Sequence, residues 1–168
     1  MAKFLKLEGG LIKETPAATT GGAGDANKIP ELDGNGRLPS NMMPVGLGAD
    51  TGAIEASENL TAGDYVNIWD DGGSFKVRKA DASTAGKEAH GFVLAAVTSG
   101  QTATVYFEGV NDQVSGMTPG VVFLSAATAG QGTATAPSGS SQVVQRLGIA
   151  ISATEVNFEA ASPIYLAA

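Results

Sequence analysis

The chain contains no cysteine, so it can form neither a disulfide framework nor a thiolate metal site. Aromatic residues make up 6% and charged residues 16% of the 168 residues, whereas glycine occurs 23 times. No apolar run approaches the roughly 18 residues of a membrane span, so we expect no membrane association. Long Leu-, Glu- and Lys-rich stretches are also missing, which argues against a helical bundle and favours many short strands joined by turns.

Positive charge is scarce, with 10 basic against 17 acidic residues and a net charge of −7. Basic and acidic residues balance over residues 1–48, so the acidic excess lies in residues 49–168. An acidic surface repels phosphate backbones, and we therefore expect no nucleic-acid partner. The first ten residues have too short an apolar run for a signal peptide, which predicts that the protein is made and kept in the cytoplasm of the producing cell, unless it leaves inside an assembly.

Composition divides the chain at about residue 48. Residues 3–13 read as one extended strand broken at Gly9-Gly10, and residues 14–27 are a linker of small and polar residues. Residues 28–44 contain three prolines, which forbid a continuous helix or a central strand. We therefore predict an extended N-terminal arm and linker over residues 1–48, followed by a β domain over residues 49–168.

The β domain contains an internal duplication. The segment that begins at Leu60 returns at Met117, with Gly63 and Gly120 separated by 57 residues. The segment around Gly91 returns around Gly148 at the same offset of 57 residues. A third pair of segments, 105–108 and 156–159, is offset by 51 residues, which fits a hairpin loop that is shorter in the second copy. Two similar units of about 50 residues are each small for an independent core, so we expect them to share one.

The fold class that follows is all-β: a compact β-sandwich or barrel built from two similar repeats and preceded by the extended arm. One helix is expected over residues 83–90, although Gly86 weakens it. Glycine-containing turns separate the predicted strands, which lie at 53–57, 65–69, 74–79, 91–97, 102–108, 120–124, 133–136, 143–151 and 154–160.

Candidate catalytic and metal-binding residues have simpler structural interpretations. His90 is the only histidine, and the second copy has Leu147 at that position, which favours packing over catalysis. Asp33-Gly34-Asn35-Gly36 opens like a calcium loop, but Arg37 and Pro44 stand where further oxygen ligands belong. We therefore expect no catalytic, metal-binding or cofactor-binding residues and no enzymatic activity.

One basic cluster, at Lys76, Arg78 and Lys79, has two interpretations. It is either a solvated strand face or a patch that meets an acidic partner. Asp70-Asp71-Gly72-Gly73 is read as a solvated hairpin turn.

Residues 25–44 resemble a segment of tailed-bacteriophage structural proteins. The pattern is Lys-Ile-x-x-Leu-Asp-x-x-Gly-Arg-Leu over residues 28–38, followed by an apolar pair and Pro44. Residues 60–166 are similar to the duplicated β domain of capsid decoration proteins, through the repeated glycine landmarks described above. The resemblance implies a virion protein, often a homotrimer, that binds the major capsid protein on the outside of an expanded head and stabilises it.

The arm has no core of its own, so its apolar residues are expected to dock on a partner. The expected capsid-binding anchors are Phe4, Leu5, Leu7, Ile29, Leu32, Leu38, Met42 and Met43. An exposed strand at residues 3–8 could also extend the sheet of a neighbouring subunit.

Two other functions stay open at the level of sequence. A tail-fibre, head-fibre or baseplate component would use the arm as a connector and the domain to attach to host glycans. Exposed aromatic residues usually serve such binding, and Trp69, Tyr65 and Tyr106 are the plausible set. A hydrolase or lyase acting on polysaccharide is the weakest alternative, because the acidic residues are scattered.

Overall fold

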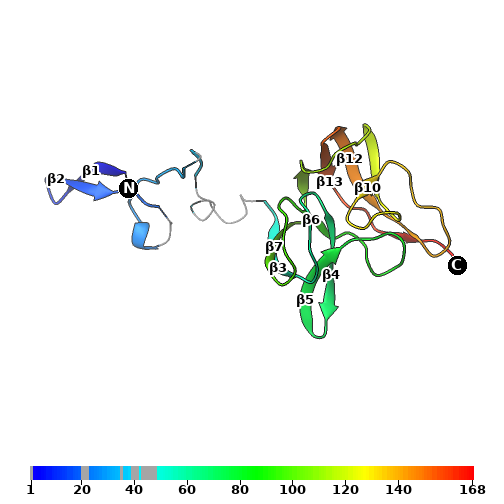
Figure 1. The fold of residues 1–168 in the computed structure, drawn as a ribbon. Helices are drawn as coiled ribbons and strands as arrows, with labels where there is room; N and C mark the ends of the chain where they lie inside the picture. Colours follow the sequence, from blue (N-terminus) through cyan, green and yellow to red (C-terminus); the bar gives the residue numbers. More distant parts are fainter. Residues whose placement is uncertain (1, 20–22, 35, 39–41, 43–48) are drawn as a thin grey trace. The chain divides into compact units, whose positions relative to one another are not determined.

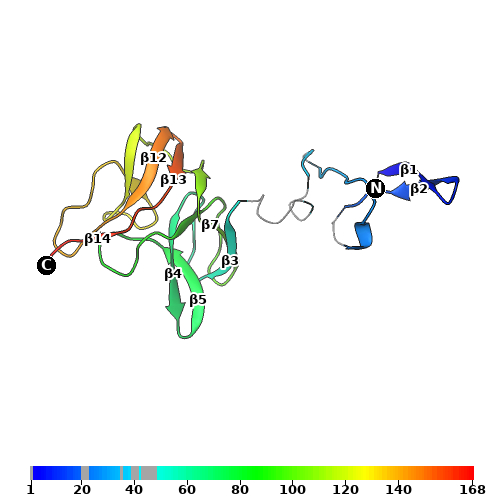
Figure 2. The same ribbon diagram turned by 180° about the vertical axis from the view of Figure 1, so that it is seen from behind.

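The computed structural model describes residues 2–19, 23–34, 36–38, 42 and 49–168 (Figure 1, and from behind in Figure 2). The chain divides into two compact units, Met1–Gly48 and Ala49–Ala168. In the described part of the chain the regular elements are strands, apart from the 3-10 helix η1 (Ala23–Asp25). The prediction of an all-β fold is therefore confirmed.

The N-terminal unit begins with an antiparallel hairpin of β1 (Lys3–Glu8) and β2 (Leu11–Pro16). Gly9 and Gly10 connect the strands with φ angles of 60° and 79°. A two-residue hairpin turn of this kind needs positive φ at both positions, which glycine adopts without steric cost. The single strand expected over residues 3–13 is therefore wrong, because the Gly-Gly pair reverses the chain and the two halves pair with each other.

A closed five-stranded barrel forms the first half of the second unit. Its strands follow the order β3 (Thr51–Ala56), β5 (Ser74–Lys79), β4 (Tyr65–Asp71), β6 (Gly91–Val93) and β7 (Thr102–Tyr106). Only β3 and β5 run parallel among these pairs. A barrel of this size has room for side chains alone. Aliphatic residues fill it, namely Ala56, Leu60, Val66, Val77, Val93, Ala103 and Val105.

An open sheet forms the second half of this unit. Its order is β10 (Gly132–Thr133), β9 (Gly120–Leu124), β12 (Arg146–Ser152), β13 (Glu155–Phe158) and β8 (Gly109–Asn111). All of its neighbouring strands are antiparallel. Two short strands, β11 (Val143–Val144) and β14 (Ile164–Tyr165), pair separately and bring the C-terminal segment beside residues 143–144.

The open sheet repeats the strand order of the barrel. The barrel strands β5-β4-β6-β7-β3 correspond in order to β10-β9-β12-β13-β8. Phe92 pairs with Tyr106 between β6 and β7, and Ile149 pairs with Asn157 between β12 and β13. These are the positions that the sequence offsets of 57 and 51 residues make equivalent. The strand order and this pair are consistent with the duplication expected from the sequence. Between β9 and β12 the register differs by one residue from that offset, because Gly148 pairs with Val122 and not with Phe123.

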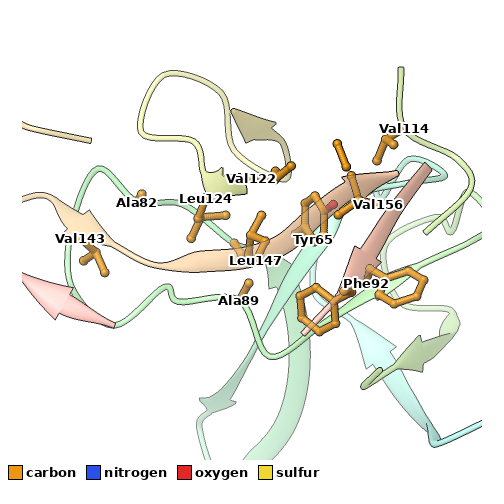
Figure 3. Close-up of a cluster of buried hydrophobic side chains, with 13 residues drawn as sticks. Tyr65, Ala82, Ala89, Phe92, Val114, Val122, Leu124, Val143, Leu147 and Val156 are labelled. Atoms are coloured by element: carbon orange, nitrogen blue, oxygen red, sulfur yellow. The ribbon is translucent and has the colours of Figure 1, made fainter. Parts of the chain in front are cut away.

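The two sheets bury one shared core (Figure 3). Tyr65 and Phe92 of the barrel contact Phe158 of the open sheet, with ring centroids 5.8 and 5.4 Å apart. Burying an aromatic side chain of this size stabilises a fold by about 1.5–3 kcal/mol. Burial also raises the pKa of the Tyr65 hydroxyl above its ordinary value, an effect that the side chain of Asn111 partly offsets. The part of the barrel's outer side that carries Tyr65 and Phe92 is thus an interior surface of the unit.

Each predicted strand range overlaps an observed strand, but several boundaries differ. The range 91–97 shortens to β6, and the range 143–151 is divided between β11 and β12. Neither β8 nor β14 was predicted, because both are short and lie outside the alternating segments.

The helix expected over residues 83–90 is wrong, since this segment contains turns and irregular backbone. Asp81 Oδ1 accepts a hydrogen bond from the Ser83 N–H (2.8 Å), and Glu88 Oε1 accepts one from the Gly86 N–H (2.8 Å). Gly86 has a φ of 86°, which ends any helical path. Local bonds from side chains to the backbone therefore replace the helical ladder.

Candidate partner-binding surfaces

One side of the N-terminal hairpin is apolar and uncovered. The register places Leu7 opposite Ile12 and Leu5 opposite Glu14, so Leu5, Leu7 and Ile12 share one side of the two strands. These three side chains, which we call the hairpin face, are between 70 and 73% exposed. An ion pair between Lys3 and Glu14 borders the face. Adjacent apolar side chains with this exposure form a surface that a partner can cover.

The opposite side of the hairpin is mixed in character. Phe4 is half-buried, whereas Leu11 is 66% exposed. Lys6 lies directly across from Lys13, and Lys13 forms an exposed ion pair with Glu8 at 3.6 Å. Exposed ion pairs contribute about 0–1 kcal/mol, so this side is a solvated surface with little binding character of its own.

The remaining predicted anchors lie further along the arm. Ile29, Leu32 and Leu38 are exposed, and Met42 is half-buried. Met43 lies outside the residues that the structure describes. The structure thus leaves Ile29, Leu32 and Leu38 accessible to a partner, in addition to the hairpin face.

Backbone hydrogen bonds hold residues 29–31 of the arm beside Ala18, which follows the end of the hairpin. The Ala18 N–H donates to the Ile29 carbonyl (2.9 Å), and the Glu31 N–H donates to the Ala18 carbonyl (2.8 Å). Asp33 Oδ1 accepts a hydrogen bond from the Arg37 N–H (2.9 Å), which closes a tight turn. The Asp33 side chain therefore serves the turn, as expected from the failed calcium pattern.

The three aromatic residues considered for glycan binding are not brought together at the surface. Tyr65 is buried in the shared core. Tyr106 is half-buried and stacks on Phe92, with a centroid distance of 5.5 Å. Trp69 lines a surface groove, and Tyr106 lines a separate hollow of about 340 Å³.

The groove beside Trp69 has a volume of about 500 Å³ and mixed charge, with Lys79, Lys87 and Asp81 among its lining residues. Trp69 Nε1 donates to Ser57 Oγ at 3.1 Å. The Arg78 guanidinium lies 4.6 Å from the Trp69 ring centroid. The indole N–H and one ring face are therefore already engaged within the protein.

Other titratable residues considered from the sequence have structural partners. His90 is exposed, and its Nδ1 accepts a hydrogen bond from the Ile68 N–H at 3.0 Å. Lys76 forms ion pairs with Asp71 at 3.0 Å and Glu55 at 3.4 Å. Hydrogen bonds to these two carboxylates raise the pKa of Lys76 above its ordinary value. Lys79 is also paired, with Asp64 at 3.4 Å, whereas Arg78 donates to Asn67 Oδ1 and to the Gly86 carbonyl.

No group of three or more His, Asp or Glu side chains is placed to hold a metal ion among the residues that the structure describes. In the same part of the chain, no helix has the length and hydrophobicity required to cross a membrane. A scan against models of known protein families, a search of curated proteins and a search of solved structures each gave no match.

Proposed function

We propose that this chain is a structural virion protein that binds the outer surface of a phage capsid and stabilises the expanded head. The hairpin face carries the proposal, because Leu5, Leu7 and Ile12 are exposed on a unit distinct from the β domain. The resemblance of residues 25–44 and 60–166 to decoration proteins supports it. The partner in this proposal is the major capsid protein, and the protein resides on the capsid surface of the virion.

The energetics of the hairpin favour such an anchor. Covering one exposed leucine or isoleucine contributes about 1–2 kcal/mol, so the hairpin face offers roughly 3–6 kcal/mol. Ordering a disordered arm costs about 1–2 kcal/mol of backbone entropy per residue. The ladder between β1 and β2 already fixes residues 3–16, which reduces that cost on binding.

We also propose that the protein acts as a homotrimer, as the resemblance implies. Three arms on one assembly would bind three capsid sites at high effective concentration, so a modest affinity for each hairpin face would suffice. Sedimentation equilibrium of the free protein tests this part independently of capsid binding.

Co-sedimentation with expanded heads stripped of surface proteins tests the proposed function, with unexpanded heads as the control shell. The informative variants are Ile12→Ser and Leu11→Ser, because the two residues are adjacent and similarly exposed but lie on opposite sides of the hairpin. We expect saturable binding to expanded heads alone, weakened about tenfold by Ile12→Ser and less than about twofold by Leu11→Ser.

A truncation tests the role of the whole arm. Removal of residues 1–44 is expected to leave a folded β domain that no longer binds heads, because the core clusters described above lie within residues 49–168. Full occupancy of the truncated protein on heads would show that the arm is not the anchor.

The second candidate function is a tail-fibre, head-fibre or baseplate component involved in host attachment. The groove beside Trp69 is the observation that favours it. This function predicts that Trp69→Ala abolishes adsorption to host cells, whereas capsid decoration predicts unchanged binding of that variant to heads.

A further inference from the structure

The outer side of the open sheet carries a continuous apolar row. Val121 of β9 lies opposite Ile149 of β12, Ile149 lies opposite Asn157 of β13, and Asn157 lies opposite Val110 of β8. The three apolar members of this row, together with Ile151, are between 42 and 56% exposed. The strands that carry Ile149 and Asn157 are neighbours in the open sheet (Figure 1). We call Val110, Val121, Ile149 and Ile151 the outer face.

The corresponding row of the barrel shows what covers such a surface. There, Tyr65, Phe92, Tyr106 and Thr51 are paired in succession across β4, β6, β7 and β3. Tyr65 and Phe92 of that row are buried against Phe158 on the inner side of the open sheet. Two positions of this row are therefore covered by another β-sheet in the first copy, where Thr51 is exposed, whereas the apolar positions of the row in the second copy are partly open to solvent.

Charge around the outer face is almost entirely negative. Glu108 and Asp112 flank β8 immediately before and after the strand that carries Val110, and both are charged. Strand alternation puts Glu155 on the same side as Asn157, and Glu159 follows the end of β13 directly.

One basic residue lies among these acids. Arg146 is paired with Glu159 at 3.5 Å, which offsets one of the negative charges. A hollow of about 460 Å³ adjoins Asn157, and the carboxylates of Asp50, Glu108 and Glu159 line it. These acidic residues surround the apolar outer face, and we call them the acidic rim. The acidic rim can bind cationic side chains of a partner.

We propose that the outer face is a second docking surface, and that its occupant is a protein surface with an apolar centre and a rim of lysine or arginine. This inference rests on the proposed function, under which that surface belongs to the expanded shell. A second copy of the chain fits poorly, because Glu155, Glu159 and their neighbours would face the same acidic rim. Since the arm and the outer face belong to one chain, binding at one raises the effective concentration at the other.

The test compares outer-face variants with a matched control in co-sedimentation with stripped, expanded heads. Ile149→Ser and Ile151→Lys each alter the outer face, whereas Phe75→Ser alters an 80% exposed residue beside the turn between β4 and β5. We expect each outer-face variant to bind heads at least tenfold more weakly than the unmodified chain, and Phe75→Ser to bind within about twofold of it. Thermal unfolding establishes that each variant retains the fold.

A salt series tests the acidic rim. The affinity of the unmodified chain should fall as salt rises, and a variant carrying Asp112→Asn and Glu155→Gln should show a shallower dependence. Equal binding of Ile149→Ser, Ile151→Lys and the unmodified chain would overturn the docking surface and leave the proposed function intact. Failure of the unmodified chain to bind heads would overturn both. Dissociation of a free oligomer by Ile149→Ser would also overturn the proposal, because the occupant would be a second copy.

Discussion

The side-chain amide of Gln145 pairs with the backbone of Ala89 as a neighbouring strand would. Gln145 Oε1 accepts a hydrogen bond from the Ala89 N–H at 2.7 Å, and Gln145 Nε2 donates to the Ala89 carbonyl at 2.9 Å. Both residues are buried. Ala89 lies just before β6 and Gln145 just before β12, so the pair joins corresponding parts of the barrel and the open sheet.

Gln145→Ala should lower the free energy of unfolding by about 2–4 kcal/mol, because it leaves a buried N–H and a buried carbonyl of Ala89 without a partner. Urea unfolding measures the change. Gln101→Ala is the control, since Gln101 is exposed and should change stability by less than about 0.5 kcal/mol. Equal stability of the two variants would show that the Gln145 pair does not hold the sheets together.

Gly148 and Gly91 are required for a close approach of strands. A Cβ atom at Gly148 would lie 2.0 Å from the Asn157 carbonyl oxygen, and one at Gly91 would lie 2.5 Å from the Tyr106 carbonyl oxygen. Gly148 also has a φ of 150°, which L-residues with side chains rarely adopt. The two glycines that reveal the duplication in the sequence therefore occupy the same restricted place in both copies.

Gly148→Ala is expected to destabilise the fold by about 2–4 kcal/mol, through steric overlap added to backbone strain. Gly72→Ala separates the two effects, because Gly72 has a φ of 64° but no neighbouring atom within 4 Å of an added Cβ. Backbone strain alone should cost that variant about 1 kcal/mol. Thermal denaturation of both variants provides the comparison, and a smaller loss for Gly148→Ala would contradict the steric explanation.

Asp64 is a buried carboxylate with three partners. It accepts hydrogen bonds from the Thr61 N–H at 2.7 Å and from Gln131 Nε2 at 3.1 Å, and Lys79 Nζ lies 3.4 Å away. Asp64→Ala should cost about 3 kcal/mol of stability, because the loss of the carboxylate leaves partly buried donors without acceptors. Asp112→Ala, at an exposed position, should stay within about 0.5 kcal/mol in the same denaturant titration. A loss of similar size at both positions would argue against a special role for Asp64.

The sequence was sufficient to predict strands wherever alternation coincided with glycine turns, as in β4 and β5. It did not identify the outer face, because Ile149 and Val121 adjoin the buried residues Ala150 and Val122. Apolar residues on both sides of a strand read as a strand buried on both sides. Which side of the sheet stays exposed to solvent depends on how the two internal repeats pack on each other, and strand periodicity gives no information about this packing.

The hairpin face was predicted in part. The sequence predicts Leu5 and Leu7 as anchors but not Ile12, because a single strand over residues 3–13 does not place Ile12 beside them. The signal lay in Gly9-Gly10, since a two-residue turn at that place puts Ile12 opposite Leu7. The helix expected at residues 83–90 failed for a similar reason, because local hydrogen bonds of Asp81 and Glu88 outweigh a weak helical pattern.

The contact between Glu88 and the C-terminal strand β14 depends on the ionisation of the Glu88 carboxyl. Partial burial alone would raise the pKa of its carboxyl, but hydrogen bonds from the Gly86 and Glu88 backbone and from Tyr165 lower the pKa below the ordinary value of 4.5. The same contact raises the pKa of the Tyr165 hydroxyl. Tyr165 belongs to β14 and pairs with Val143, so the ionised form of Glu88 favours the docked C-terminal strand.

Because the pKa of Glu88 is lower in the folded state, its stabilising effect is complete above the ordinary pKa and disappears as the pH falls through the folded-state pKa. Glu88→Gln should therefore be less stable than the unmodified chain at pH 7, by no more than about 1 kcal/mol because solvent screens the partly exposed group. The difference should shrink below about pH 4.5, where the unmodified carboxyl takes up its proton. Urea unfolding of both proteins between pH 3 and pH 7 measures this, and a difference that does not vary with pH would contradict the role of the ionised carboxylate.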